Sequence, residues 1–200
     1  FIVFGGWSDR KSTTEILKTF IKLYGKNKRV ELILNAENDY FFDGCRSTQE
    51  RMIKYDVCSN NIKIVNKLPR EQYLDYMQRG NVFLSCARGE GWNIPLIEAM
   101  ACGTPAIYSS CGGQLEFALG KGIPVRIKDK VIASKYNCDT PGLWYEPDFD
   151  DLESKMIDVY ENYPLYKQKA VIESEFIRKD FTWDKSVDSA MVYLNELINK

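Results

Sequence analysis

The feature of the sequence that most constrains the fold is a regular alternation of short β-rich runs with segments of helical periodicity. The β-rich runs cover residues 1–4, 30–34, 62–65, 82–85 and 106–108. Helical patterns cover residues 13–24, 48–55, 69–77, 95–101, 149–160, 165–178 and 183–198. This alternation is typical of βαβ units with parallel strands. We therefore predict an α/β fold with a Rossmann-like, doubly wound parallel sheet.

Hydroxyl and glycine residues mark the ends of several predicted helices. Ser12 or Thr13 is expected to cap the first helix, and Gly103 is expected to end the fourth. The closing helix, about residues 183–199, is long and amphipathic. No element is predicted between residues 121 and 145, a polar stretch without clear periodicity.

Composition limits the size of the fold and the classes of partner. With 200 residues and 44% hydrophobic content, the chain can form one domain with a substantial core, and we assign residues 1–200 to it. The 27 basic and 28 acidic residues create no overall positive field, so we expect no nucleic-acid partner. The sequence has no histidine, which removes the commonest metal ligand and general base.

The sequence also indicates a location. Its apolar stretches are far shorter than the roughly 20 residues that cross a bilayer, and no signal-peptide pattern opens the chain. The six cysteines form no C-x-x-C pair and fit reduced thiols. We therefore expect a cytoplasmic protein. Because the sequence opens on a strand without an initiator methionine, we interpret it as part of a longer chain.

Two glutamates, Glu90 and Glu98, stand in a glycine-rich loop after a buried strand and in the helix that follows. In a doubly wound sheet, ligands bind at the carboxyl ends of the strands. The positive end of the helix and the free backbone N–H groups of the loop favour an anion; these amides belong to Gly91, Trp92, Asn93 and Ile94. A carboxylate at Glu98 suits ribose hydroxyls, and one at Glu90 suits sugar hydroxyls. From spacing alone, a solvated Glu90 and a helix-start acid at Glu98 stay open as alternatives.

The longer passage around Glu90 and Glu98 favours a functional role for them over these alternatives. Residues 90–105, read as E-G-W-N-I-P-L-I-E-A-M-A-C-G-T-P, resemble the E-x7-E signature of GT4-type glycosyltransferases, the glycosyl transferases group 1. Residues 112–116 resemble the G-G-x-x-E stretch of that family, and residues 144–148 resemble its tyrosine–proline–aspartate segment before a helix. The resemblance implies the GT-B fold, in which two Rossmann-like halves enclose the active site. This chain is similar to the second, C-terminal half, which binds the donor.

The resemblance also assigns roles to loops elsewhere in the chain. Lys11 stands where the family lysine binds the donor diphosphate. Gly6 stands where the family more often has arginine, so Arg10 is expected to supply the second positive charge. Solvated charges before a helix are the alternative for this pair. Lys67 and Leu68, after the third strand, stand where family members hold the nucleobase through backbone groups.

The implied reaction is transfer of a sugar from a nucleotide diphosphate sugar to an acceptor hydroxyl, with retention at the anomeric carbon. Cations and helix-end dipoles would stabilise the leaving diphosphate. Lys11, Arg10 and Glu90 are the catalytic candidates, and Glu98 is expected to bind the ribose. Trp92 is expected either to contact the donor or to cover the helix. A metal ion is usually unnecessary in this family, and we predict no metal site and no cofactor.

The resemblance implies several partners outside this chain. We expect a nucleotide-sugar donor, an N-terminal GT-B domain, and a glycan, lipid-linked or small-molecule acceptor. Peripheral association with the cytoplasmic face of a membrane would occur through the missing domain. This chain alone is expected to bind donor without turnover. A catalytically degenerate nucleotide-sugar-binding module, favoured by Gly6, and a GT-B-fold epimerase stay open as alternatives.

Overall fold

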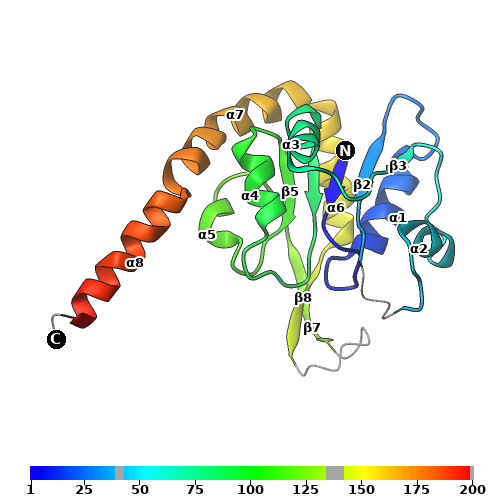
Figure 1. Cartoon of the computed structure of the whole chain (residues 1–200). Helices are drawn as coiled ribbons and strands as arrows, with labels where there is room; N and C mark the ends of the chain where they lie inside the picture. Colours follow the sequence, from blue (N-terminus) through cyan, green and yellow to red (C-terminus); the bar gives the residue numbers. More distant parts are fainter. Residues whose placement is uncertain (39–42, 134–141, 199–200) are drawn as a thin grey trace.

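The main sheet of the protein has six parallel strands in the order β3-β2-β1-β4-β5-β6 (Figure 1). The computed structural model describes residues 1–38, 43–133 and 142–198. The chain winds outward in one direction from β1 to β3 and in the other from β4 to β6, so β1 and β4 flank the point where the winding reverses. The predicted doubly wound sheet is therefore confirmed. Its strands are β1 (Ile2–Phe4), β2 (Leu32–Asn35), β3 (Ile62–Ile64), β4 (Phe83–Ser85), β5 (Ala106–Ser109) and β6 (Ile123–Val125).

Helices cover both faces of this sheet, because alternate strand side chains point to opposite faces. Val3 belongs to one core cluster, whereas Ile2 and Phe4 belong to the other. The first cluster contains side chains of α1 (Thr13–Tyr24), α2 (Thr48–Lys54) and α6 (Phe149–Glu161). The second contains side chains of α3 (Arg70–Arg79), α4 (Ile94–Ala101), α5 (Leu115–Ala118) and α7 (Tyr163–Asp180).

The stretch without a predicted element, residues 121–145, contains strand structure. β6 lies at the edge of the main sheet, where its Pro124 costs no central hydrogen bond. β7 (Ile127–Ile132) and β8 (Leu143–Pro147) form a separate antiparallel ribbon. β7 was missed because lysine and aspartate interrupt its apolar alternation, as expected for a strand outside the core. Residues 134–141, including Cys138, lie outside the described residues.

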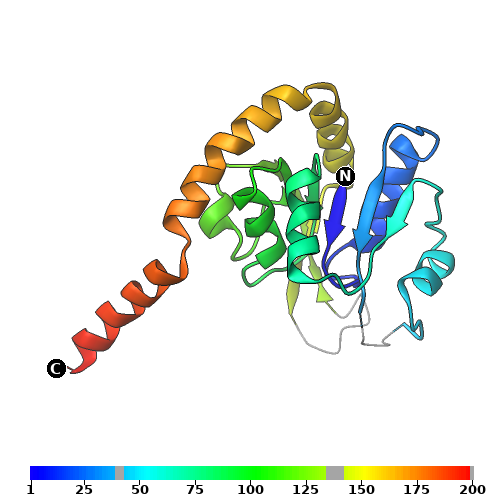
Figure 2. The same ribbon diagram turned by 45° about the horizontal axis from the view of Figure 1, so that its top comes forward.

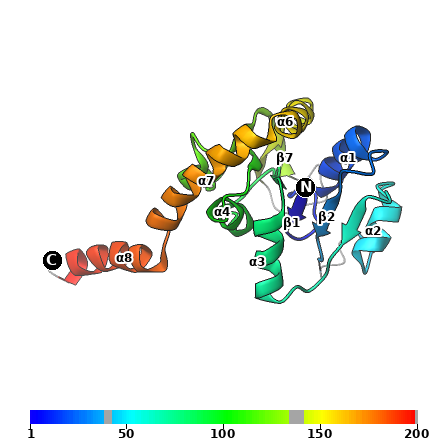
Figure 3. The same cartoon turned by 90° about the horizontal axis from the view of Figure 1, so that it is seen from above.

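The chain ends in two long helices. α7 packs across α4, and α8 (Trp183–Ile198) then extends away from the body of the domain (Figure 3). No side chain of α8 is buried. The predicted closing helix is therefore present with its apolar face exposed; its predicted end at residue 199 lies outside the described residues. Among the described residues, no helix combines the length and apolar character needed to cross a membrane.

The start of α1 differs from the sequence-based expectation. Ser12 occupies the N-cap position with a φ of 52°, but its side chain makes no capping hydrogen bond, and in the described chain its buried Oγ has no partner. The preceding turn explains the difference. The Ser12 amide donates to the carbonyl of Asp9 at 3.1 Å, and the Lys11 amide donates to Ser8. This turn sets the backbone of Ser12 and also directs the side chain of Lys11.

Candidate functional site

The predicted site lies at the carboxyl edge of the sheet, where the loops after β1 and β4 meet (Figure 2). The loop after β1 covers residues 5–12, and the loop after β4 covers residues 86–93. The Arg88 amide donates to the carbonyl of Arg10 at 2.7 Å, which joins the two loops directly. This edge at a switch point is where doubly wound sheets bind ligands.

The structure brings the three catalytic candidates, Glu90, Arg10 and Lys11, together. Arg10 Nη1 lies 3.1 Å from Glu90 Oε1, and Lys11 Nζ forms an ion pair with the same oxygen. Arg10 also donates to the carbonyl of Gly89 at 2.6 Å. The Glu90 side chain is only 8% exposed. Arg10 and Lys11 therefore form one cationic pair, and a nearly buried carboxylate partly neutralises it.

Gly6 lies beside the segment that follows β2. A Cβ at Gly6 would lie 3.3 Å from the carbonyl oxygen of Glu37, in the segment after β2. Gly5 is the glycine next to Lys11: a Cβ there would lie 3.6 Å from Lys11 Cε, and its φ of +140° favours glycine. Gly6 is thus a neighbour of the β2 loop, and Arg10 supplies the second cation.

Gly112 and Gly113, the glycine pair after β5, contact the backbone of the loop that carries Glu90. The Gly113 amide donates to the carbonyl of Glu90 at 2.9 Å. A Cβ at Gly113 would lie 1.8 Å from the oxygen of Gly91, and one at Gly112 would lie 2.6 Å from the oxygen of Glu90. Gly112 also has a φ of +74°. The G-G-x-x-E resemblance therefore corresponds to a backbone contact that larger residues would block.

The backbone amides of residues 91–94 are open to a ligand. Within the part of the chain that the structure describes, these N–H groups donate no hydrogen bond. They precede and open α4, whose positive end favours anions. Asn93 is 5% exposed as a whole residue, and its side chain donates to Ser85 Oγ at 2.9 Å and to Gln114 Oε1 at 2.6 Å. The side chain is therefore engaged inside the protein, and the predicted contact of Asn93 with an anion rests on its backbone amide alone.

Trp92 packs on aromatic neighbours. Its ring centroid lies 5.4 Å from that of Phe117 and 6.0 Å from that of Phe181, at the junction of α7 and α8. The side chain is still 40% exposed, and the neighbouring Ile94 is more exposed. Packing against α5 thus accounts for part of the Trp92 surface, while the remainder faces solvent.

Glu98 faces a different element from Glu90. Its Oε1 lies 2.6 Å from Arg70 Nη2, and its Oε2 accepts a hydrogen bond from the Tyr73 hydroxyl at 2.7 Å. Burial, reinforced by the hydrogen bond to this carboxylate, raises the pKa of Tyr73 above its usual range, so the phenol stays a donor. The two signature glutamates therefore lie at two ends of the candidate site, one against the β1 loop and one against α3.

Lys67 and Leu68 follow β3 at the same edge of the sheet. The strand was expected to end at residue 65 but ends at Ile64. Lys67 is exposed with a φ of 42°, and Leu68 packs against the core cluster that contains α3. Their side chains join neither glutamate, so any contact with a base would use the backbone.

The sequence patterns indicated no role for Arg88, which stands two positions before Glu90. Arg88 is 1% exposed and binds carboxylates of α1 and β8. The one feature of the sequence that could have pointed to Arg88 is its position between a buried strand and a glycine-rich loop.

In residues 1–38, 43–133 and 142–198, no three His, Cys, Asp or Glu side chains form a group that could hold a metal ion. The described cysteines are free thiols, as expected.

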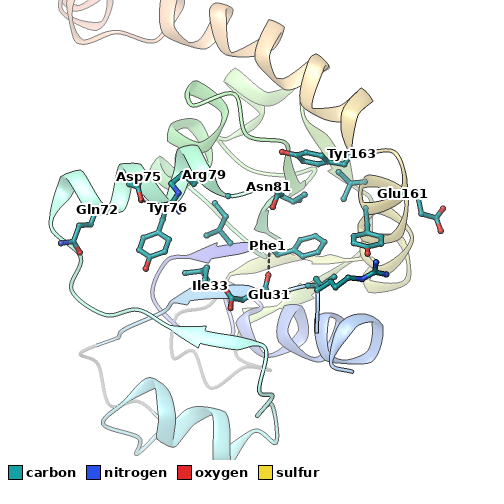
Figure 4. Close-up of a pocket in the computed structure, with 17 residues that line it drawn as sticks. Phe1, Glu31, Ile33, Gln72, Asp75, Tyr76, Arg79, Asn81, Glu161 and Tyr163 are labelled. Carbon is teal, nitrogen blue, oxygen red and sulfur yellow. Dashed lines mark hydrogen bonds and ion pairs between the residues drawn. The ribbon is translucent and has the colours of Figure 1, made fainter. Parts of the chain in front are cut away.

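A large cavity opens at the opposite, amino edge of the sheet. Its volume is about 1060 Å³, and Phe1, Glu31, Tyr76, Arg79 and Tyr163 are among its lining residues (Figure 4). None of the predicted site residues lines it. We place the site at the carboxyl edge because the paired charges and the open amides converge there.

Comparison with known proteins agrees with this fold. A sequence profile of glycosyl transferases group 1 matches residues 43–170, more than half of the chain. The chain is 25% identical over 186 residues to an uncharacterized glycosyltransferase of Methanocaldococcus jannaschii, covering 89% of this chain and 47% of that protein.

Two solved structures share the fold at low identity. Sucrose-phosphate synthase from Thermosynechococcus elongatus superposes with a TM-score of 0.72 and 18% identity, over 100% of this chain and 46% of that one. HepE from Anabaena, in complex with UDP and glucose, superposes with a TM-score of 0.71 and 15% identity, over 98% of this chain and 48% of that one. This chain thus spans about half the length of these proteins, and its Rossmann-like sheet is of the GT-B type. The chain belongs to the glycosyl transferases group 1 family.

Proposed function

We propose that this chain is the donor-binding, C-terminal half of a retaining glycosyltransferase of the GT4 type. It would move a sugar from a nucleotide diphosphate sugar to an acceptor hydroxyl. The observation that carries this proposal is the convergence of Arg10, Lys11 and Glu90 beside the open amides of residues 91–94. The structure of HepE with UDP and glucose supports it, because that protein shares the fold.

The proposed chemistry depends on stabilising the leaving group. Breaking the bond between the sugar and the diphosphate leaves negative charge on the phosphate oxygens, which fixed cations and amides stabilise without reorganisation. Lys11 and Arg10 would supply the cations, and the start of α4 would supply the amides. Glu90 would orient the sugar through its hydroxyls. These roles need no metal ion or further cofactor, because the protein's own cations face the diphosphate.

The nucleoside would lie toward α3. Glu98 would accept hydrogen bonds from the ribose hydroxyls by exchanging its exposed partner Arg70, while Tyr73 keeps its other oxygen in place. The backbone of Lys67 and Leu68 would hold the base, since these residues follow β3 on the same side. Trp92 would border the sugar with its exposed edge.

We further propose that the acceptor binds to a second half of the protein. The chain spans about half the length of its relatives, so an N-terminal GT-B domain would complete the cleft. This chain, proposed as one domain over residues 1–200, would bind donor and not turn over by itself. The complete enzyme would act in the cytoplasm on a glycan, lipid-linked or small-molecule acceptor, with membrane association through its other domain.

The test is a calorimetric titration of the chain with UDP, GDP, ADP and their common sugar conjugates. We expect one nucleotide to bind selectively and the Glu98→Gln variant to lose about tenfold in affinity, since a charged hydrogen bond is removed. Glu71→Gln, an exposed acid on α3, is the matched control and should bind as the unchanged chain does. If no nucleotide binds, the proposal that this chain binds the donor by itself fails, and a domain that has lost its binding site or a site that needs the missing half is favoured; conversion of a nucleotide sugar without acceptor would indicate an epimerase.

A further inference from the structure

Arg88 is a buried cation at the centre of the loops that build the candidate site. It follows β4 and is 1% exposed. Its Nε lies 2.7 Å from Glu146 Oε2, and its Nη2 lies 2.9 Å from Glu146 Oε1, a bidentate pair with β8. Nη2 also lies 2.8 Å from Glu15 Oε1 in the first turn of α1. One guanidinium therefore connects three elements that are distant in sequence.

Arg88 also forms hydrogen bonds to the loop after β1. Arg88 Nη1 donates to the carbonyl of Asp9, and the Arg88 amide donates to the carbonyl of Arg10 at 2.7 Å. In return, Arg10 Nη1 donates to the carbonyl of Gly89 at 2.6 Å. These contacts set the backbone of residues 9–11 directly against residues 88–90. The side chains of Arg10 and Lys11 then reach Glu90 from this fixed backbone.

The chemistry of these contacts requires arginine. Burial opposes the charge of Arg88, but the carboxylates of Glu146 and Glu15 outweigh it and raise the pKa of the guanidinium, which stays charged. Its planar fork holds Glu146 through two nitrogens while the third reaches Asp9. A lysine offers all its donors from a single atom and cannot span these acceptors.

We infer that Arg88 is a positioning residue that holds Arg10 and Lys11 in place and thereby sets the affinity of the site for the diphosphate part of the donor. This inference rests on the proposed function, because it takes the diphosphate as the ligand of these cations. Arg88 itself is covered by its partners and would not touch the donor. Its effect would therefore be confined to the diphosphate end, while the Glu98 end would be unaffected.

The first measurement needs no ligand. Arg88→Lys keeps the charge and removes the fork, and Arg51→Lys is its matched control. Arg51 is also fully buried, but its fork holds Asp43 through Nε at 3.0 Å and Nη2 at 3.2 Å. In hydrogen exchange by mass spectrometry, Arg88→Lys should speed exchange in residues 9–12 and 88–91 together. Arg51→Lys should speed it around residues 43–52. Unchanged exchange in both site loops of Arg88→Lys would overturn the inference.

The second measurement separates positioning from general loss of stability. The chain is titrated with the nucleoside diphosphate that it binds best and with the corresponding nucleoside. Arg88→Lys should lower the affinity for the diphosphate about tenfold or more, as loss of charged hydrogen bonds would, and that for the nucleoside less than about twofold. Arg51→Lys should change neither. A parallel fall for both ligands would mean that Arg88 has only a structural role.

Two outcomes need separate treatment. If Arg88→Lys does not fold, Glu146→Gln replaces it, since this variant keeps Arg88 and removes the charge of one anchor; the same selective loss, smaller in size, is expected. If the unchanged chain binds no nucleoside diphosphate, the proposed function and the affinity effect both fail. The exchange comparison would then still decide whether Arg88 positions the loops.

Discussion

The two glutamates of the signature are both ion-paired, but in different surroundings. Glu90 is 8% exposed and is held by Arg10 and Lys11, about eighty residues away along the chain. Glu98 is 18% exposed, and its partner Arg70, on the neighbouring α3, is 61% exposed. Lys11 is 17% exposed and Arg10 is 42% exposed, so the Glu90 end is more enclosed by tertiary packing than the Glu98 end.

This difference indicates how the two ends would respond to a ligand. Exposed ion pairs contribute little to stability, so Arg70 can leave Glu98 at small cost when ribose hydroxyls arrive. Fixed charges in a site of low exposure attract a charged ligand more strongly, because the protein and solvent around them need little reorganisation. We expect the Glu90 end to dominate affinity for the diphosphate and the Glu98 end to adjust to the nucleoside. Substitutions at four positions test this contrast.

The largest effect is expected at the glycine that supports the Glu90 loop. Gly113→Ala would place a Cβ 1.8 Å from the oxygen of Gly91, so the backbone must move. We expect the free energy of unfolding to fall by about 3 kcal/mol, as for severe overpacking. Chemical denaturation measures this. Gly142→Ala is the control, because among the described residues no atom lies within 4 Å of a Cβ there. Equal stability of the two variants would mean that the loops are not in firm contact.

The next effect is expected at Lys11. Lys11→Gln removes a cation that is only 17% exposed, and we expect the affinity for a nucleoside diphosphate to fall about thirtyfold, or about 2 kcal/mol. The affinity for the nucleoside should stay the same, because that part contacts the Glu98 end. Calorimetry of both ligands gives the ratio. Lys18→Gln, an exposed lysine on α1, serves as control. An equal loss for nucleoside and diphosphate would contradict the division into two ends.

A smaller effect of opposite sign is expected at Glu90. Glu90→Gln keeps the size of the side chain but removes the carboxylate that competes with phosphate for Arg10 and Lys11. We expect the affinity for the free diphosphate to rise about threefold, a modest gain because salt screens the charges that reach solvent. The gain should be smaller for the sugar conjugate, which loses its contact with Glu90. Weaker binding of the free diphosphate would show that Glu90 holds the cations in place and does not compete with the ligand.

The smallest effect is expected at Tyr73. Tyr73→Phe removes one hydrogen bond to Glu98, and its ring can still pack on Phe4, whose centroid lies 5.3 Å away. We expect about a twofold loss of affinity, equal for the nucleoside and the diphosphate, since one neutral donor is removed. Tyr76→Phe, on the same helix and also packed on Phe4, is the control. A loss confined to the diphosphate would place Glu98 at the wrong end of the site.

Much of the architecture followed from local pattern. The helix over residues 13–24 was predicted with the bounds that the structure has, and the closing helix was predicted with the start that it has, residue 183. The alternation of elements was enough for the parallel, doubly wound sheet. The elements that escaped prediction are short or lie outside the core, and β6 is a strand of only three residues at the edge of the sheet. β7 and β8 form an exposed ribbon, and α5 is a single turn.

The candidate site shows the same limit more sharply. Glu90, Lys11 and Glu98 were identified from the sequence, and the structure places the first two in contact. The sequence left open whether Arg10 replaces the arginine that the family more often has at the position of Gly6, and it assigned the backbone amide of Asn93 to the ligand. The structure turns the Asn93 side chain inward and brings Arg10 to Glu90. The structure also shows the ion pair of Arg88 with Glu146, and no sequence pattern had indicated a role for Arg88.

By itself, the sequence determined the fold class and most of the helices and strands, and it predicted the candidate site at one edge of the sheet. These features depend on the periodicity with which apolar residues return to one face, and that periodicity is local. Only the tertiary structure decided which polar and charged groups pair with one another. Arg10 and Gly89, and likewise Asp9 and Arg88, are separated by 79 positions and meet only after the sheet has formed. The direction of a side chain in such a contact depends on packing between distant segments, which no local pattern contains.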